Sequence, residues 1–105
     1  MAKRRVDRNH IIYRIWCEST GDDYIGLTVA RGRAYKKSTE RRWKDHLYQA
    51  FKEGRRFPLH CLIRELGAEA FKHEILHIVR GKKDAHAVEL VLIKSRKPTL
   101  NVTGL

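Results

Sequence analysis

Two short runs of apolar residues lie near the start of the chain, with a polar cluster between them. The runs are residues 11–17 and 24–27, and the polar cluster, residues 18–23, contains a glycine. β-Branched and aromatic residues on either side of such a loop are typical of a β-hairpin. Each run carries one tyrosine, Tyr13 or Tyr24, and antiparallel pairing can bring two such residues within reach. The pattern therefore predicts a hairpin with neighbouring tyrosines.

Helical periodicity begins after this hairpin. Ser38 or Thr39 can cap a helix that runs to about Glu53, and Gly54 can end it. Arg42 and His46 are four residues apart and share one edge of this helix, where a guanidinium can grip a phosphate. The alternative is an exposed pair with no function. Four apolar residues recur at helical spacing and form the expected buried stripe, namely Trp43, Leu47, Ala50 and Phe51.

Two more helices are predicted further along the chain. Pro58 can begin a helix that ends at Leu66 before Gly67. Its inward residues are expected to be Leu59, Leu62, Ile63 and Leu66, and His60 and Cys61 are interpreted as packing or surface residues. Asp84 can cap a last helix over residues 85–96, which is apolar almost all round except for Glu89. A carboxylate among apolar neighbours is costly unless a cation or hydrogen bonds compensate it. A metal ion or Arg42 could be that partner of Glu89, and an exposed position of Glu89 is the alternative.

The charge of the chain indicates a polyanionic partner. Lysine and arginine total 23 against 12 acidic residues in 105 residues, which gives a net charge of +11. Nucleic acid fits this excess best, because phosphate neutralisation releases counterions. We read neither a transmembrane span nor a secretory signal in the sequence. Its two isolated cysteines fit a reducing cytoplasm and disfavour structural zinc.

The domain organisation expected is a basic N-terminal arm over residues 1–9 and a single domain over residues 10–105. A basic segment at about residues 29–37 is interpreted as a loop along a nucleic-acid backbone, and a solvated loop is the alternative. Its cations are Arg31, Arg33, Lys36 and Lys37.

Several short motifs follow one another in a distinctive order. In chain order they are Ile12-Tyr13, Tyr24-Ile25-Gly26 about ten residues later, Arg42 to His46, residues 62–71, Glu89 and Leu100-Asn101. This order resembles the GIY-YIG nuclease family over residues 10–104. The resemblance implies an α+β fold, a three-stranded antiparallel sheet flanked by helices, whose members cut phosphodiester bonds with one divalent cation. It also makes residues 29–37 look like an insertion.

The resemblance also implies roles for individual residues. Glu89 would hold Mg²⁺ or Mn²⁺, because such hard cations prefer oxygen ligands. Tyr13 would act as general base or orient the attacking water, and Tyr24 would contact the scissile phosphate. The remaining catalytic residues would be Arg42, which stabilises negative charge, and His46, which positions or deprotonates the nucleophile. Nucleic-acid contacts and support of the site are expected from Arg14, Arg31, Arg33, Lys36, Lys37 and Asn101.

Two departures from the family pattern affect the expected site. Ile11 stands where the family usually has glycine, and Arg41 is an alternative to Arg42 because of the insertion. A tyrosine ordinarily ionises at about pH 10, so Arg42 or the metal would have to lower the pKa of Tyr13 for it to act as a base.

A competing motif is HExxH at residues 73–77, which in zinc proteases places two histidines on one helix face. The resemblance instead makes residues 71–79 the third strand. A strand would put His73, Ile75 and His77 on one face, too far apart to share a metal comfortably.

The leading hypothesis is therefore a metal-dependent DNA endonuclease or nickase of low or structure-dependent specificity. A homodimer or a partner protein could serve double-strand cutting, and degradation of host DNA by a phage is one setting that would suit it. The alternatives are a catalytically silent nucleic-acid-binding protein on the same scaffold and, as a minor one, a zinc hydrolase.

Overall fold

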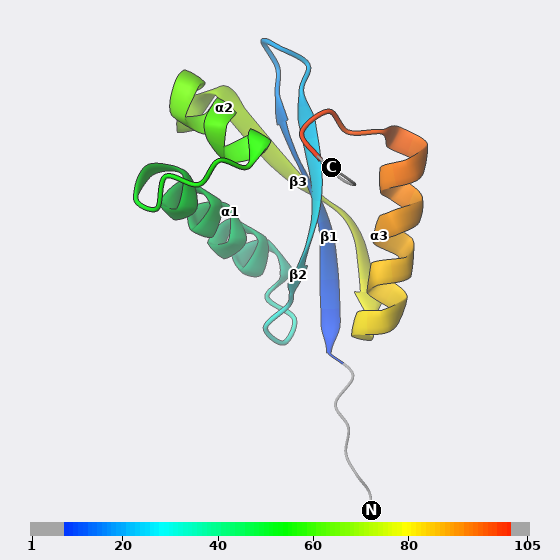
Figure 1. Cartoon of the computed structure of the whole chain (residues 1–105). Coiled ribbons are helices and arrows are strands. Elements are labelled where there is room, and N and C mark those ends of the chain that lie inside the picture. Colours follow the sequence, from blue (N-terminus) through cyan, green and yellow to red (C-terminus); the bar gives the residue numbers. More distant parts are fainter. Residues whose placement is uncertain (1–7, 102–105) are drawn as a thin grey trace, which may run out of the picture.

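A three-stranded antiparallel sheet lies at the centre of the protein, and helices cover both of its faces (Figure 1). The computed structural model describes residues 8–101, so most of the predicted N-terminal arm, residues 1–7, lies outside the described part. The elements in chain order are β1 (Asn9–Cys17), β2 (Asp23–Val29), α1 (Tyr35–Phe51), α2 (Pro58–Leu66), the short 3-10 helix η1 (Ala68–Ala70), β3 (Phe71–Arg80) and α3 (Lys82–Arg96). This architecture confirms the predicted fold class.

β1 is the central strand, in the order β2-β1-β3. Its alternate residues Ile11, Tyr13, Ile15 and Cys17 are buried in one core cluster with α1 and α2, whose contributions include Ala50, Leu59 and Ile63. α3 covers the opposite face of the sheet (Figure 1). Burial on both faces explains why β1 is apolar at six of its nine positions rather than at every second one.

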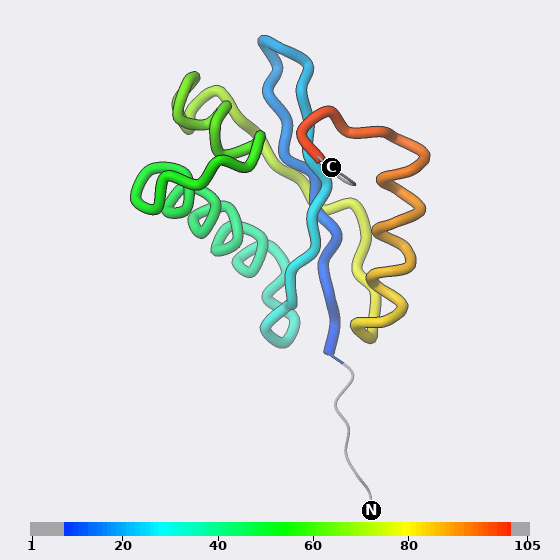
Figure 2. Tube along the Cα trace, in the orientation of Figure 1, coloured from blue at the N-terminus to red at the C-terminus, as the bar shows by residue number. Residues whose placement is uncertain are grey.

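The C-terminal segment covers part of the outer edge of β2. The chain returns from α3 to the hairpin, as the trace in Figure 2 shows, and the Leu100 amide donates to the Asp23 carbonyl oxygen at 2.8 Å. The Asn101 side chain makes two hydrogen bonds of 2.8 Å with the backbone of Ile25. Its Oδ1 accepts from the Ile25 N–H group, and its Nδ2 donates to the Ile25 carbonyl oxygen. An edge strand left unpaired exposes its backbone polar groups, so these bonds protect the first half of β2.

α1 differs from its prediction at both ends. It begins at Tyr35, and neither predicted cap works as one: the Ser38 hydroxyl accepts a bond from the Arg31 amide, and the Thr39 hydroxyl donates to the Tyr35 carbonyl. The basic segment 29–37 is therefore a loop only over residues 30–34. Phe51, predicted to be buried, is 51% exposed.

The two other helices follow their predictions more closely. α2 has the predicted bounds, although Leu66 is exposed. α3 begins at Lys82 after Gly81, whose φ of 91° is typical of glycine, and Asp84 lies in its first turn without capping it. α3 is not buried all round, because Leu90 and Val91 are exposed.

The HExxH residues lie on β3, which confirms the predicted strand. A bulge at Leu76 shifts the register, so His73 pairs with Ile15 and His77 pairs with Ile12. Ile12 and Ile15 are three residues apart on β1 and point to opposite faces, so the prediction that His73 and His77 share a face is wrong. Over residues 8–101 there is no group of three His, Cys, Asp or Glu side chains that could hold a metal, and no helix long and apolar enough to cross a membrane.

Candidate active site

The predicted tyrosine pair meets over a glycine. Tyr13 of β1 pairs with Gly26 of β2, and the ring centroids of Tyr13 and Tyr24 are 6.1 Å apart. A Cβ atom at Gly26 would lie 2.5 Å from the Tyr13 hydroxyl oxygen and 2.7 Å from Cε2 of Tyr24. Gly26 is thus the position that lets both phenol rings lie against the strand.

The Tyr13 hydroxyl is the centre of a buried hydrogen-bond chain. Arg42 Nε of α1 donates to it at 3.2 Å, and His46 Nε2 lies 2.8 Å from it. His46 Nδ1 in turn lies 3.0 Å from Nε2 of His60 on α2. The hydrogen bonds thereby connect side chains of β1, α1 and α2.

The hydrogen positions in this series of hydrogen bonds can be assigned from which groups can donate and which can accept. A guanidinium can only donate, so the Tyr13 hydroxyl accepts from Arg42 and has its own hydrogen to give. Its other partner is His46 Nε2, which accepts that hydrogen in the tautomer whose hydrogen is on Nδ1. In this tautomer His46 donates from Nδ1 to His60 Nε2, and His60 carries its own hydrogen on Nδ1.

Burial keeps these groups uncharged at neutral pH, apart from Arg42. Desolvation raises the pKa of Tyr13 well above its usual value, more than the neighbouring Arg42 lowers it. Desolvation, together with the charge of Arg42 and the neighbouring His60, lowers the pKa of His46 to about 3. His46 is 2% exposed, so the interpretation of Arg42 and His46 as an exposed pair is wrong, and the expected neutral imidazole fits.

A pocket of about 200 Å³ opens where α1, α2 and β2 meet. Its wall contains Arg42, His46 and His60, and it is completed by Tyr24, Gln49, Arg55 and Phe57. Tyr24 packs edge-on against His46 and Phe57, with ring centroids 5.5 and 5.6 Å apart. The side of Tyr24 that faces α1 is therefore positively charged and aromatic.

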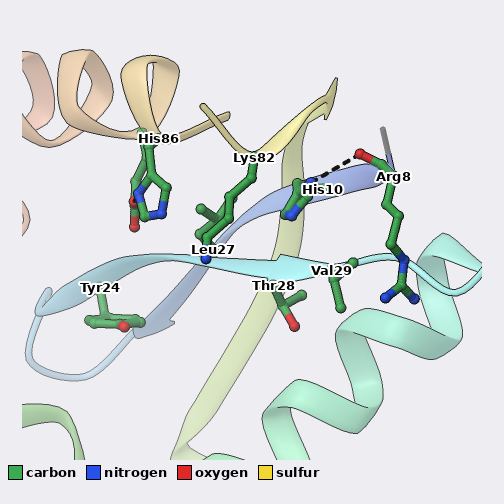
Figure 3. Close-up of a pocket in the computed structure, with 9 residues that line it drawn as sticks. Arg8, His10, Tyr24, Leu27, Thr28, Val29, Lys82 and His86 are labelled. Atoms are coloured by element: carbon green, nitrogen blue, oxygen red, sulfur yellow. Dashed lines mark hydrogen bonds and ion pairs between the residues drawn. The ribbon is translucent and has the colours of Figure 1, made fainter. Parts of the chain in front are cut away.

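A larger pocket, of about 660 Å³, lies on the α3 side of β2. Figure 3 shows Tyr24, Lys82 and His86 around it, and Glu89 also lines it. The Glu89 side chain is 16% exposed and lies 3.6 Å from His86 Nδ1. Desolvation raises the pKa of Glu89, and the nearby His86 only partly offsets this effect.

The position of Glu89 is suitable for a metal ligand. Mg²⁺ keeps several water ligands and is commonly held by one or two carboxylates together with substrate phosphate oxygens. A largely buried carboxylate beside a pocket of about 660 Å³ offers such a position, and a bound cation would offset the cost of its desolvation.

Tyr24 lines both pockets and so joins the two halves of the candidate site. Arg42, His46 and Tyr13 lie on the α1 side, and Glu89 lies on the α3 side. The structure thus brings all five predicted catalytic residues to β2 and the strand beside it, although Tyr13 is buried and lines neither pocket.

The predicted nucleic-acid-binding residues divide into two groups. Arg31, Arg33, Lys36 and Lys37 are exposed, and Arg31 lines a small pocket of about 160 Å³ together with Arg41 and Arg42. Arg41, the alternative to Arg42, is exposed, whereas Arg42 contacts Tyr13.

Arg14 and Asn101 have partners within the protein. Arg14 pairs with Asp23 at 3.1 Å and with Glu74 at 3.5 Å, and its guanidinium lies 4.7 Å from the centre of the Trp16 ring. Asn101 supports β2 through the two backbone bonds described above, which agrees with a supporting role.

The sequence interpretation missed His60 as a site residue. It is 4% exposed and contacts His46, although it was expected to be a packing or surface residue. Its spacing from Ile63, one turn further along α2, could have placed it on the inward face of that helix.

The fold and this arrangement of tyrosines, arginine and acid define a nuclease-type catalytic domain. A family model described as "GIY-YIG catalytic domain" matches residues 9–101, and the chain belongs to that family. Nucleases of this family generally depend on a divalent metal. Searches of curated proteins and of solved structures gave no match.

Proposed function

We propose that this protein is a divalent-metal-dependent endonuclease or nickase that hydrolyses phosphodiester bonds in DNA with low or structure-dependent specificity. The observation that carries the proposal is the meeting of Tyr24 with Arg42 on one side and Glu89 on the other. A phosphodiester seated at Tyr24 would lie between a fixed positive charge and a carboxylate able to bind a cation.

Arg42 is the residue proposed to stabilise the transition state. Negative charge builds up on the phosphoryl oxygens as water attacks phosphorus, and a preorganised donor aimed at that charge commonly contributes a few kcal/mol. Arg42 donates from Nε to Tyr13, which leaves its terminal nitrogens available to a phosphate. The Tyr24 hydroxyl would position the same phosphate.

Tyr13 and His46 are proposed to handle the proton of the attacking water. The Tyr13 oxygen accepts one bond from Arg42 and donates one to His46, so one lone pair is left. Because Tyr13 is buried, the attacking water would have to enter the space beside Tyr13 to use that lone pair. Because both groups are neutral, Tyr13 can take the water's proton while it gives its own hydrogen to His46 Nε2. This route avoids a free phenolate, which the raised pKa of Tyr13 disfavours. It places the proton on His46, whose lowered pKa makes the protonated state short-lived.

Glu89 is proposed to hold the metal ion, with Mg²⁺ or Mn²⁺ as candidates. When bound, such an ion neutralises phosphate charge and stabilises the leaving oxygen. The net charge of +11 and the exposed cations around the first turn of α1 would supply sequence-independent affinity for DNA.

The test is incubation of supercoiled plasmid with Mg²⁺, Mn²⁺ or EDTA. We expect nicked or linear product with a divalent ion and none with EDTA. Glu89→Ala should lower cleavage at least about a hundredfold, because the metal position is lost, while DNA binding is nearly unchanged. Asp84→Ala is the matched control, since Asp84 is an exposed acid on the same helix that lines neither pocket.

Two outcomes would contradict the proposal. Cleavage by Glu89→Ala at the rate of the unmodified protein would remove Glu89 from the chemistry. Salt-sensitive DNA binding without cleavage under any divalent ion would instead favour the catalytically silent binding protein.

A further inference from the structure

The buried hydrogen-bond chain does not end at His46, since His60 continues it. We propose that His60 is a positioning residue: by accepting the Nδ1 hydrogen of His46, it holds His46 in the tautomer whose Nε2 can receive the proton of Tyr13. The inference deepens the proposed function and rests on it, because it gives His60 a role in the same hydrolysis.

The geometry gives His60 this role independently of any substrate. The distance of 3.0 Å between His46 Nδ1 and His60 Nε2 is that of a hydrogen bond, and both imidazoles are buried. A neutral imidazole has two tautomers, and the bond made by one nitrogen decides which one forms. An acceptor opposite Nδ1 therefore leaves Nε2 free of hydrogen and facing the Tyr13 hydroxyl.

His60 has a buried nitrogen atom that lowers the stability of the fold, and packing alone does not explain why a histidine is found there. Within residues 8–101, His60 Nδ1 is the one buried side-chain nitrogen or oxygen atom without a hydrogen-bond partner. A buried N–H group without a partner opposes folding, and such groups call for an explanation. An apolar residue at this position would avoid that penalty, but it would remove the acceptor for His46.

The surroundings of His60 keep its accepting lone pair available. Desolvation lowers the pKa of His60, and the charges of Arg55, Arg42 and Arg64 lower it further. His60 is therefore neutral at neutral pH, and its Nε2 can accept. With Nε2 protonated, two N–H groups would face each other and the bond would be lost.

In the proposed step, the oxygen of the attacking water forms a bond to phosphorus as the bond from phosphorus to the leaving oxygen breaks. The water's proton passes to the Tyr13 oxygen, and the Tyr13 hydrogen passes to His46 Nε2. The leaving oxygen departs as an alkoxide and takes up a proton from solvent. The His46 imidazolium, which is a strong acid because of its low pKa, returns its extra proton through Tyr13 to solvent. His60 accepts the Nδ1 hydrogen of His46 throughout, as a third group that orients a base.

The activity test compares two kinds of substitution at His60. His60→Gln places an amide oxygen near the position of Nε2 and keeps an acceptor, whereas His60→Phe and His60→Leu remove it. We expect single-turnover plasmid cleavage to fall about a hundredfold in the apolar variants and to recover largely in His60→Gln. His77→Phe, at an exposed histidine of β3, is the matched control and should cleave like the unmodified protein.

The second readout is the tautomer of His46, measured through the ring nitrogens by NMR on protein labelled with ¹⁵N-histidine. We expect hydrogen on Nδ1 in the unmodified protein and in His60→Gln, and a shift toward Nε2 in His60→Phe. Thermal unfolding should change little in the apolar variants, because one buried N–H loses its partner as another is removed. A purely structural role predicts lower stability and an unchanged tautomer.

Three outcomes overturn the inference: an unmodified cleavage rate in folded His60→Phe and His60→Leu, an unchanged His46 tautomer in these variants, or no recovery in His60→Gln. Absence of cleavage by the unmodified protein with every divalent ion would overturn the proposed function instead. In that case the tautomer measurement alone decides whether His60 orients His46.

Discussion

A single glycine determines whether the two phenol rings can occupy the site. A methyl group at Gly26 would overlap Tyr13 and Tyr24, at 2.5 and 2.7 Å, and the Tyr13 ring has no room to move, since it is 1% exposed. Interiors are packed at crystal-like density, so such an overlap displaces side chains or backbone.

We therefore expect Gly26→Ala to lower stability by about 1–3 kcal/mol and cleavage at least about a hundredfold, since small displacements of reacting groups are costly. Urea unfolding and plasmid cleavage measure the two effects. Gly21→Ala is the control, because a Cβ at Gly21, in the hairpin loop, has nothing within 4 Å. Although its φ of 79° makes that change strained too, cleavage by Gly21→Ala should persist. A fully active Gly26→Ala would contradict the tight packing.

His46 should make the folded protein sensitive to acid. Its pKa is about 3 in the folded state and about 6.5 when unfolded, so the unfolded chain binds more protons between these values. Stability therefore falls as the pH drops below about 6.5, and the loss from this group alone should reach about 2 kcal/mol by pH 5.

We expect His46→Gln to lose less of its free energy of unfolding than the unmodified protein when urea titrations at pH 7 and pH 5 are compared. His77→Gln, at an exposed histidine, should keep the unmodified pH dependence. Equal pH dependence in all three proteins would mean that the His46 imidazole is not buried in neutral form.

At the scale of the elements, the start of α1 is the part that we expect to lie along a nucleic-acid backbone. Lys36 and Lys37 lie in its first turn, next to the loop that carries Arg31 and Arg33, and all four are exposed. Each lysine that neutralises a phosphate releases counterions, which adds about one to the salt slope of binding.

Replacing both Lys36 and Lys37 with alanine should therefore reduce the slope of log K against log salt concentration by about two, with a similar loss of affinity for unrelated DNA sequences. The measurement is fluorescence anisotropy in EDTA, so that no cleavage occurs. Lys72→Ala is the control, because Lys72 of β3 pairs with Glu18 of the hairpin loop. An unchanged slope in the double variant would indicate that DNA binds elsewhere.

The elements that could be predicted from the sequence are those with strong local signals. Pro58 and Gly67 gave the bounds of α2, and the turn residues gave the hairpin. The predicted start of α1 lies after the observed one, because the N-cap, Ala34, has no capping side chain, while Ser38 and Thr39 have other partners. The bulge in β3 depends on pairing with β1, which no local pattern in β3 records.

The same contrast applies to the candidate site. Tyr13, Tyr24, Arg42, His46 and Glu89 were identified through the order of short motifs. His60 was missed because its role depends on contact with α1 across fourteen residues. Arg14, a predicted nucleic-acid contact, pairs with Asp23 and Glu74, partners that only the assembled sheet brings together.

At the scale of the whole molecule, β2 separates two chemically different halves. The α1 side carries a fixed cation and neutral proton carriers, and the α3 side carries the carboxylate. A phosphodiester can therefore be contacted from both sides along the edge strand. This division assigns the pH dependence of catalysis to Glu89 rather than to His46, since His46 stays neutral down to about pH 3.

The effect of Mg²⁺ concentration on the acidic side of the rate–pH profile (the acid limb) tests this assignment. Glu89 must be ionised to bind a cation, and desolvation raises its pKa, so cleavage should fall on the acid side as Glu89 takes up a proton. Because the cation and the proton compete for the same carboxylate, raising the Mg²⁺ concentration should move the limb to lower pH. On the alkaline side of the rate–pH profile, the raised pKa values of Tyr13 and Tyr24 should keep cleavage steady beyond about pH 10 as long as the protein stays folded.

Rate–pH profiles at several Mg²⁺ concentrations measure the acidic and the alkaline side, with circular dichroism as the control for unfolding. If the position of the acid limb did not change with the Mg²⁺ concentration, a group other than the metal ligand would be titrating there.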